Sequence, residues 1–204
     1  LPSELGLITS LESVHLFTNA LSGPLPSELG LLTKLEALYL RENQLTGLLP
    51  SELGLITSLE MIDLFSNYLN GTLPSELGLL TKLEDLILGN NALTGLLPTQ
   101  IGLLSSMSRL FLFENALLGP IPSELGVIET LDDLSLYDNE LTGTIPWELG
   151  RLSRLRSLIL YGNQLSGGIP SELGELSNMD ILYLSSNGIT GPIPSELALL
   201  TVLQ

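Results

Sequence analysis

The chain has 204 residues, 44% of them hydrophobic, and its 23 acidic residues against 7 Lys and Arg give a formal net charge of −16. This charge argues against nucleic-acid binding and against attachment to anionic membranes, because both require clustered basic side chains. The absence of cysteine excludes zinc sites built on thiolates. No apolar run approaches the roughly 18 residues of a membrane-spanning helix, so we expect no direct membrane insertion and no targeting signal in this segment.

Asparagine recurs every 24 residues along the whole chain, as Asn19, Asn43, Asn67, Asn91, Asn115, Asn139, Asn163 and Asn187. Counted from Leu1, this period defines eight repeats that start at residues 1, 25, 49, 73, 97, 121, 145 and 169, and a partial repeat at 193–204. No linker interrupts them, so we expect one solenoid domain over 1–204. Stacked repeats need polar caps that are missing here, so we expect a fragment of a longer chain or a chain whose ends are covered by partners.

Each repeat begins with a segment such as Pro-Ser-Glu-Leu-Gly at 26–30, which predicts a short helical turn. Proline would stand early in the turn, serine would cap it, and glutamate would lie near its positive end. Glycine occupies positions six and 23 of the repeat in 16 of its 20 occurrences. Such regularity indicates either turns with positive φ or close approaches between coils.

Leucines then alternate with variable residues, as in 35–41, which predicts a strand with one buried face. One such strand in every coil would form a parallel sheet with strands about 4.8 Å apart. We expect the asparagine after the strand to turn inward and to bond the backbone of adjacent coils. The predicted fold class is therefore an α/β repeat solenoid.

Residues 45–50 (Leu-Thr-Gly-Leu-Leu-Pro) and 141–146 (Leu-Thr-Gly-Thr-Ile-Pro) match the LxGxIP signature of plant-type leucine-rich repeats. The chain is similar throughout to receptor-like kinase ectodomains, polygalacturonase-inhibiting proteins, and diatom and algal repeat arrays. The resemblance implies a superhelix with a concave parallel sheet, a second short sheet, and 3₁₀ turns on the convex side. It also implies ligand recognition without catalysis, and an extracellular or membrane-anchored location. The cysteine-containing caps of family ectodomains are missing.

Positions 13, 15 and 17 of each repeat should face solvent on the concave side, and eight of the nine Phe and Tyr residues occupy positions 15 and 17. Leucines already fill the core, so we interpret this face as a protein- or peptide-binding surface. Exposed apolar residues at the same positions favour that interpretation, namely Met61, Ile87, Ile159 and Ile181. The candidate ligand-binding residues are Phe17, Tyr39, Arg41, Phe65, Arg109, Phe111, Phe113, Tyr137, Tyr161 and Tyr183.

Within this set, Phe113, Tyr137 and Tyr161 share position 17 in successive coils and should form a ridge. The alternative is that the aromatic rings only stabilise the sheet. Two other functions compete with protein binding. The solenoid could be a structural spacer in a large assembly or at a cell surface, or the rings could stack on a glycan.

Glutamate fills position four in eight of nine coils, and six further acids occupy position 12. Weak Ca²⁺ binding is one interpretation, and a solvated face that keeps the solenoid soluble is the one we favour. His15 is the sole histidine and suits a contact residue. Asp132, Asp133 and Asp138 resemble a metal cluster, but two of them are strand neighbours that should point to opposite sides or to the strand's edge. We expect no enzymatic activity, no metal and no cofactor.

Two further residues have separate interpretations. Asn70 begins the one N-glycosylation sequon, Asn-Gly-Thr, and is a possible glycosylation site. Trp147 replaces the usual serine at position three and is a candidate second contact point on the outer side.

Overall fold

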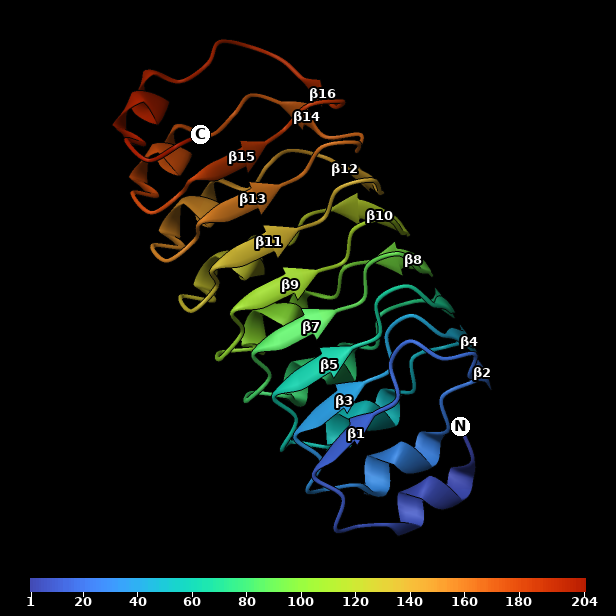
Figure 1. Cartoon of the computed structure of the whole chain (residues 1–204). Helices are drawn as coiled ribbons and strands as arrows, with labels where there is room; N and C mark the ends of the chain where they lie inside the picture. Colours follow the sequence, from blue (N-terminus) through green and yellow to red (C-terminus); the bar gives the residue numbers. More distant parts are fainter.

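Every 24-residue repeat forms one coil with a 3₁₀ helix, a three-residue strand and a second short strand. This computed structural model describes all residues, 1–204, and its coils stack from the N-terminus to the C-terminus (Figure 1). The predicted leucine-rich-repeat solenoid is confirmed. None of the helices is long and apolar enough to cross a membrane.

The first strand of each coil joins an eight-stranded parallel sheet on one side of the stack, which we call the concave sheet (Figure 1). Each residue pairs with the residue 24 positions later, as Leu38 does with Ile62, so side chains at equal repeat positions line up across the sheet. Its strands are β1 (Ser13–His15), β3 (Ala37–Tyr39), β5 (Met61–Asp63), β7 (Asp85–Ile87), β9 (Arg109–Phe111), β11 (Asp133–Ser135), β13 (Ser157–Ile159) and β15 (Ile181–Tyr183).

The second strands form another parallel sheet, which is interrupted once. Six strands pair continuously: β2 (Ser22–Gly23), β4 (Gln44–Gly47), β6 (Tyr68–Gly71), β8 (Ala92–Leu96), β10 (Ala116–Pro120) and β12 (Glu140–Thr142). A separate pair follows, β14 (Ser166–Gly167) and β16 (Gly188–Ile189). Only a bridge between Thr144 and Ser166 connects the two parts.

The other side of each coil carries a five-residue 3₁₀ helix. The helices are η1 (Ser3–Leu7), η2 (Ser27–Leu31), η3 (Ser51–Leu55), η4 (Ser75–Leu79), η5 (Thr99–Leu103), η6 (Ser123–Val127), η7 (Trp147–Arg151), η8 (Ser171–Glu175) and η9 (Ser195–Leu199). The predicted serine caps are wrong. An extended proline such as Pro26 precedes each helix, and no side chain caps it. The serine already belongs to the helix, and its hydroxyl donates to the next glutamate, as from Ser27 to Glu28.

A continuous apolar core runs through the stack, between the sheets and the helices. It contains 47 buried residues, most of them the leucines at fixed repeat positions, and Leu38 and Leu40 are completely inaccessible. Each coil covers the leucines of its neighbours, so stability depends on stacking rather than on any single coil.

The repeated asparagines tie consecutive coils together, as the sequence predicts. The Asn139 side-chain amide donates to the carbonyls of Leu136 in its own coil and Leu112 in the preceding coil, both at 3.1 Å. Its oxygen accepts from the backbone amide of Leu117 at 3.0 Å. These bonds satisfy backbone groups that the turn after the strand would otherwise leave buried without partners.

The two glycine positions have different physical reasons. At position 23, Gly143 has φ +79°, a conformation that a side chain disfavours. At position six, a β-carbon on Gly126 would lie 2.4 Å from the Glu148 carbonyl oxygen of the next coil. Position 23 therefore permits a backbone with positive φ in or beside the second strand, and position six permits the helices of neighbouring coils to approach closely.

Candidate ligand-binding face

Aromatic side chains form a stacked row across the concave sheet. The Phe113 and Tyr137 rings stack with centroids 4.6 Å apart and 7° between their planes. The Tyr137 and Tyr161 rings stack at 4.6 Å and 14°. The in-register pairing of β9, β11 and β13 sets this spacing, because position 17 lies two residues after the end of each strand.

Two further rings extend this row. Phe113 lies 5.8 Å from Phe65 and 6.3 Å from Phe111, measured between ring centroids. Phe65 is two coils away, and Phe113 reaches it across Gly89, which is buried beneath the Phe113 ring. We call Phe65, Phe111, Phe113, Tyr137 and Tyr161 the aromatic ridge; all five side chains are partly exposed.

A second, smaller group lies near the N-terminal end of the same face. Tyr39 stacks on His15 with centroids 4.7 Å apart, and His15 meets Phe17 edge-on at 6.5 Å. The Arg41 guanidinium lies 5.0 Å from the centre of the Phe17 ring. Tyr183, at the other end of the sheet, is half exposed and joins neither group.

Two acidic residues of the concave face are buried, although their positions predict exposure to solvent. Asp63 and Asp85 are only 3% and 6% exposed, because arginines of neighbouring coils cover them. Arg109 contacts Asp85 through both Nε and a terminal nitrogen. Arg41 lies 3.6 Å from Asp63, and burial raises the pKa of the Asp63 carboxyl. These two candidate arginines are therefore held by the protein itself.

The apolar residues expected to be exposed are in fact half buried, namely Met61, Ile87, Ile159 and Ile181. Neighbouring side chains on the same face cover part of each one, since in-register pairing places equal repeat positions side by side. Their contribution to an exposed apolar surface is smaller than predicted, and the aromatic ridge provides most of it.

Carboxylates lie beside the two tyrosines of the aromatic ridge. The Tyr137 hydroxyl donates to Glu114 at 3.4 Å. Loss of hydration raises the pKa of Tyr137 to about 12, and the negative charge of Glu114 adds to the shift. The pKa of Tyr161 is also raised, first by loss of hydration and then by Asp138. Burial, followed by repulsion from Asp132, raises the pKa of Asp133 on β11.

The acids singled out elsewhere in the sequence do not converge on a common point. Asp132 pairs with Arg154 at 2.8 Å, while Asp133 lies on the concave face. No group of three or more His, Asp or Glu side chains is arranged to hold a metal ion. Seven of the eight position-four glutamates accept a hydrogen bond from the preceding serine, as Glu76 does from Ser75 at 3.1 Å.

The outer residues singled out in the sequence are accessible. The side chain of Asn70 is exposed on β6. Trp147 is 47% exposed at the start of η7, and the Arg151 guanidinium lies 4.6 Å from the centre of its ring. Trp147 also borders a groove between the second sheet and the 3₁₀ helices.

The sequence places Asp63, Asp85 and Gly89 on the concave face, but it did not predict that all three are buried there, and it missed the groove beside Trp147. Opposite charges in register, such as Asp85 and Arg109 at position 13 of neighbouring coils, were a readable signal for the ion pair. Gly89 occupies position 17 in the coil before Phe113, and its missing side chain was a signal for the space that the Phe113 ring covers. The groove has no comparable signal apart from Trp147.

Comparison with known proteins agrees with this architecture. The Leucine Rich Repeat family profile matches residues 34–55, 58–80, 130–152, 154–176 and 178–200, more than half of the chain. No curated protein sequence matches. Among solved structures, a TDR receptor aligns with a TM-score of 0.96 and 36% identity, over 100% of this chain and 35% of its own.

The ectodomain of the Arabidopsis receptor kinase HAESA, in complex with an IDA peptide hormone, aligns with a TM-score of 0.92 and 34% identity, over 100% of this chain and 35% of its own. A plant ice-binding protein aligns with a TM-score of 0.76 and 28% identity, over 95% of this chain and 70% of its own. The chain thus spans about a third of the length of these receptor structures. It belongs to the leucine-rich repeat family, and its repeats are of the plant type.

Proposed function

We propose that this chain is a non-catalytic, peptide-binding part of a receptor-like protein that lies outside the cell. Its ligand would be an extended peptide on the concave face, over the aromatic ridge. Two similar structures support this proposal, since HAESA is in complex with a peptide hormone and RGFR1 is in complex with RGF2. The fold alone does not decide the ligand, because the same fold also occurs in an ice-binding protein.

The observation that carries the proposal is the row of partly exposed rings at Phe113, Tyr137 and Tyr161. Leucines fill the core without them, so the rings are not needed as core residues. Grouped aromatic side chains that remain accessible are typical of protein-binding surfaces, where they supply much of the binding energy.

The surroundings of the ridge favour a peptide with basic and apolar side chains. Glu114 and Asp138 lie close enough to raise the pKa values of Tyr137 and Tyr161, whereas Arg109 on the same sheet is paired with Asp85. Basic groups of a ligand would therefore find carboxylates beside the rings, which strengthens binding and guides orientation.

The stacking geometry favours a peptide over a glycan. Both faces of the Tyr137 ring pack against neighbouring rings, Phe113 on one side and Tyr161 on the other. A sugar stacks on an aromatic face, whereas an extended peptide can lie across ring edges and hydroxyl groups. The ridge offers mainly edges.

Selection from a random peptide display library tests the proposal, with a Tyr137→Ala/Tyr161→Ala double variant as counter-target. We expect enriched peptides rich in Arg, Lys and apolar residues that bind the wild type and lose at least about tenfold in affinity for the variant. Tyr68→Ala is the matched control, because Tyr68 is exposed on the second sheet.

Circular dichroism should give the same melting behaviour for the double variant and the control. Peptides that bind all three proteins equally would place recognition elsewhere. Failure to enrich any peptide, together with partner contacts confined to the end coils, would favour a structural spacer.

A further inference from the structure

A groove on the other side of the molecule has the features of a small-molecule site. It crosses three coils between the second sheet and helices η5, η6 and η7, and none of its lining residues belongs to the concave sheet. Its volume is about 700 Å³. Pockets that bind small organic ligands have volumes in this range and are mostly apolar, with a few placed polar groups.

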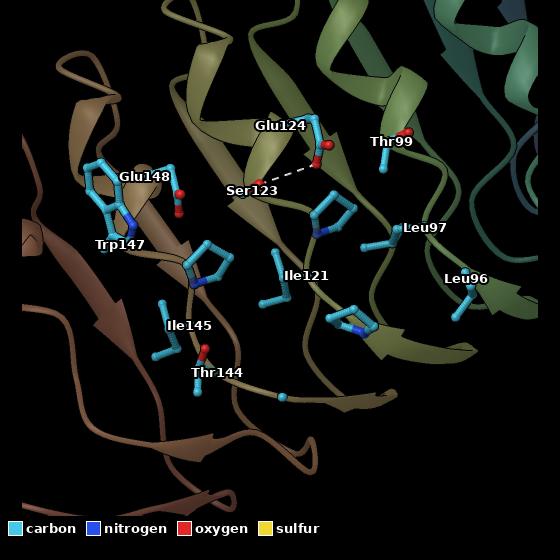
Figure 2. Close-up of a pocket in the computed structure, with 14 residues that line it drawn as sticks. Leu96, Leu97, Thr99, Ile121, Ser123, Glu124, Thr144, Ile145, Trp147 and Glu148 are labelled. Atoms are coloured by element: carbon cyan, nitrogen blue, oxygen red, sulfur yellow. Dashed lines mark hydrogen bonds between the residues drawn. The ribbon is translucent and has the colours of Figure 1, made fainter.

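The floor of the groove is apolar. Leu97, Ile121 and Ile145 occupy position one of three successive coils, and each is less than 5% exposed. Figure 2 shows Ile121 and Ile145 in the middle, with Trp147 and Glu148 at one end and Leu96 towards the other. Leu96 is 61% exposed and provides an apolar wall that no other part of the chain covers.

Trp147 explains why the groove occurs here and not along the whole stack. Seven of the nine coils have serine at position three. The seventh coil has Trp147 there, and its indole ring extends one side of the groove beyond what a serine side chain would. The six-stranded part of the second sheet also ends beside the groove, since only the Thr144–Ser166 bridge connects it to β14 and β16. Arg151 packs on the Trp147 ring, and is not among the groove residues itself.

The charged residues that line the groove are both acidic, Glu124 and Glu148. Neither forms an ion pair in the structure, and Glu124 accepts one long hydrogen bond from Ser123 at 3.5 Å (Figure 2). An apolar floor, an indole ring and two unpaired carboxylates together suit a ligand with an apolar body and a positive charge. A cation near an indole and a carboxylate gains from both.

We propose that this groove binds a small organic cation, an amine attached to an aromatic or alkyl body. The apolar body would lie over Ile121 and Ile145, and the ammonium group would lie between Trp147 and the two glutamates. This site is separate from the concave face, so its test does not depend on whether the peptide-binding proposal is correct.

Trp147 is the sole tryptophan, so its fluorescence reports on the groove directly. The test titrates the chain with 2-phenylethylamine and compares phenylacetate, which has a similar size and the opposite charge. We expect a saturable change of Trp147 emission with the amine, and binding at least about tenfold weaker with phenylacetate. The Glu124→Gln/Glu148→Gln double variant should lower the affinity for the amine by a similar factor.

Calorimetry with Trp147→Ser completes the test, because serine is the residue of most other coils and should leave the fold intact. The amine should no longer bind the Trp147→Ser variant. The Tyr137→Ala/Tyr161→Ala variant changes only the concave face, so it should bind the amine as tightly as the wild type does. Absence of saturable binding to the wild type would overturn the proposal. Equal binding of phenylacetate, or unchanged amine affinity in the double glutamine variant, would also overturn it.

Discussion

The Phe113 ring covers Gly89 so closely that a β-carbon at residue 89 would lie 2.7 Å from Phe113 Cζ. Both residues occupy position 17, in adjacent coils, and Phe113 fills the space that a side chain at residue 89 would take. From there its ring centre is 5.8 Å from that of Phe65. The glycine therefore makes the aromatic ridge continuous across a coil that contributes no ring.

Substituting Gly89→Ala should displace Phe113 from this place. We expect a loss of about 1–2 kcal/mol in the free energy of unfolding, since the ring must move away from well-packed neighbours. Chemical denaturation measures the loss, and near-UV circular dichroism reports the change in ring stacking. Gly168→Ala is the control, because its β-carbon would meet nothing closer than 3.8 Å. Equal free energies of unfolding for the two variants would show that the Phe113–Gly89 contact does not contribute to stability.

Tyr137 should titrate abnormally. Its pKa is raised to about 12, so the folded protein keeps the phenol protonated at pH values where the unfolded chain has lost the proton. Stability should therefore fall as pH rises from about 10 towards 12, because the unfolded state then binds fewer protons than the folded state. Ultraviolet titration of the wild type and Tyr137→Phe isolates this group. A Tyr137 transition near pH 10 would contradict the assignment.

The two buried aspartates should respond differently to neutralisation. Burial raises the pKa of Asp63, so its charged form opposes folding; stability from this group is lost as pH rises above the ordinary value of 3.8. Asp63→Asn should cost under about 0.5 kcal/mol or stabilise the protein at pH 7. Asp85→Asn should cost about 1–3 kcal/mol, because it breaks the two-point contact with Arg109. Chemical denaturation at pH 7 compares them, and a larger loss for Asp63→Asn would contradict this account.

The asparagine ladder provides another matched comparison. Asn139 bonds the backbone of its own and the neighbouring coil and is buried, whereas the exposed Asn19 donates only to Leu16 and Phe17 in its own coil. Asn139→Ala should cost about 3 kcal/mol through the buried groups it leaves unpaired, and Asn19→Ala under about 1 kcal/mol. Thermal and chemical denaturation measure both. Similar losses would mean that bonding between coils adds little.

Much of the fold could be predicted because one pattern repeats without a shift. The spacing of Asn43 and Asn67 fixes coil length, and the alternation of leucines in 35–41 fixes which strand face is buried. The serine caps failed because a proline in extended conformation already precedes each helix, and the serine hydroxyl prefers the adjacent carboxylate. Local sequence cannot show whether the serine caps the helix or is its first residue, since both arrangements place serine at the start of a helical turn.

The ring row at Tyr137 and Tyr161 could also be predicted, because register alone places equal positions side by side. The burial of Asp63 could not, since it depends on how far Arg41 reaches across from the neighbouring coil. The groove beside Trp147 depends on the gap between the second sheet and the helices, which three-dimensional packing sets. Whether the ridge binds a ligand stays a prediction.

Crosslinking mass spectrometry of the native, full-length protein in its source extract tests the central claim most directly. Carboxylate-directed reagents suit this chain, which is rich in acids on both sides. The account predicts that a basic peptide or protein partner is crosslinked to Glu114 or Asp138, beside the tyrosines of the aromatic ridge. Partner crosslinks confined to the outer glutamates or to the two end coils, with none on the concave face, would contradict it.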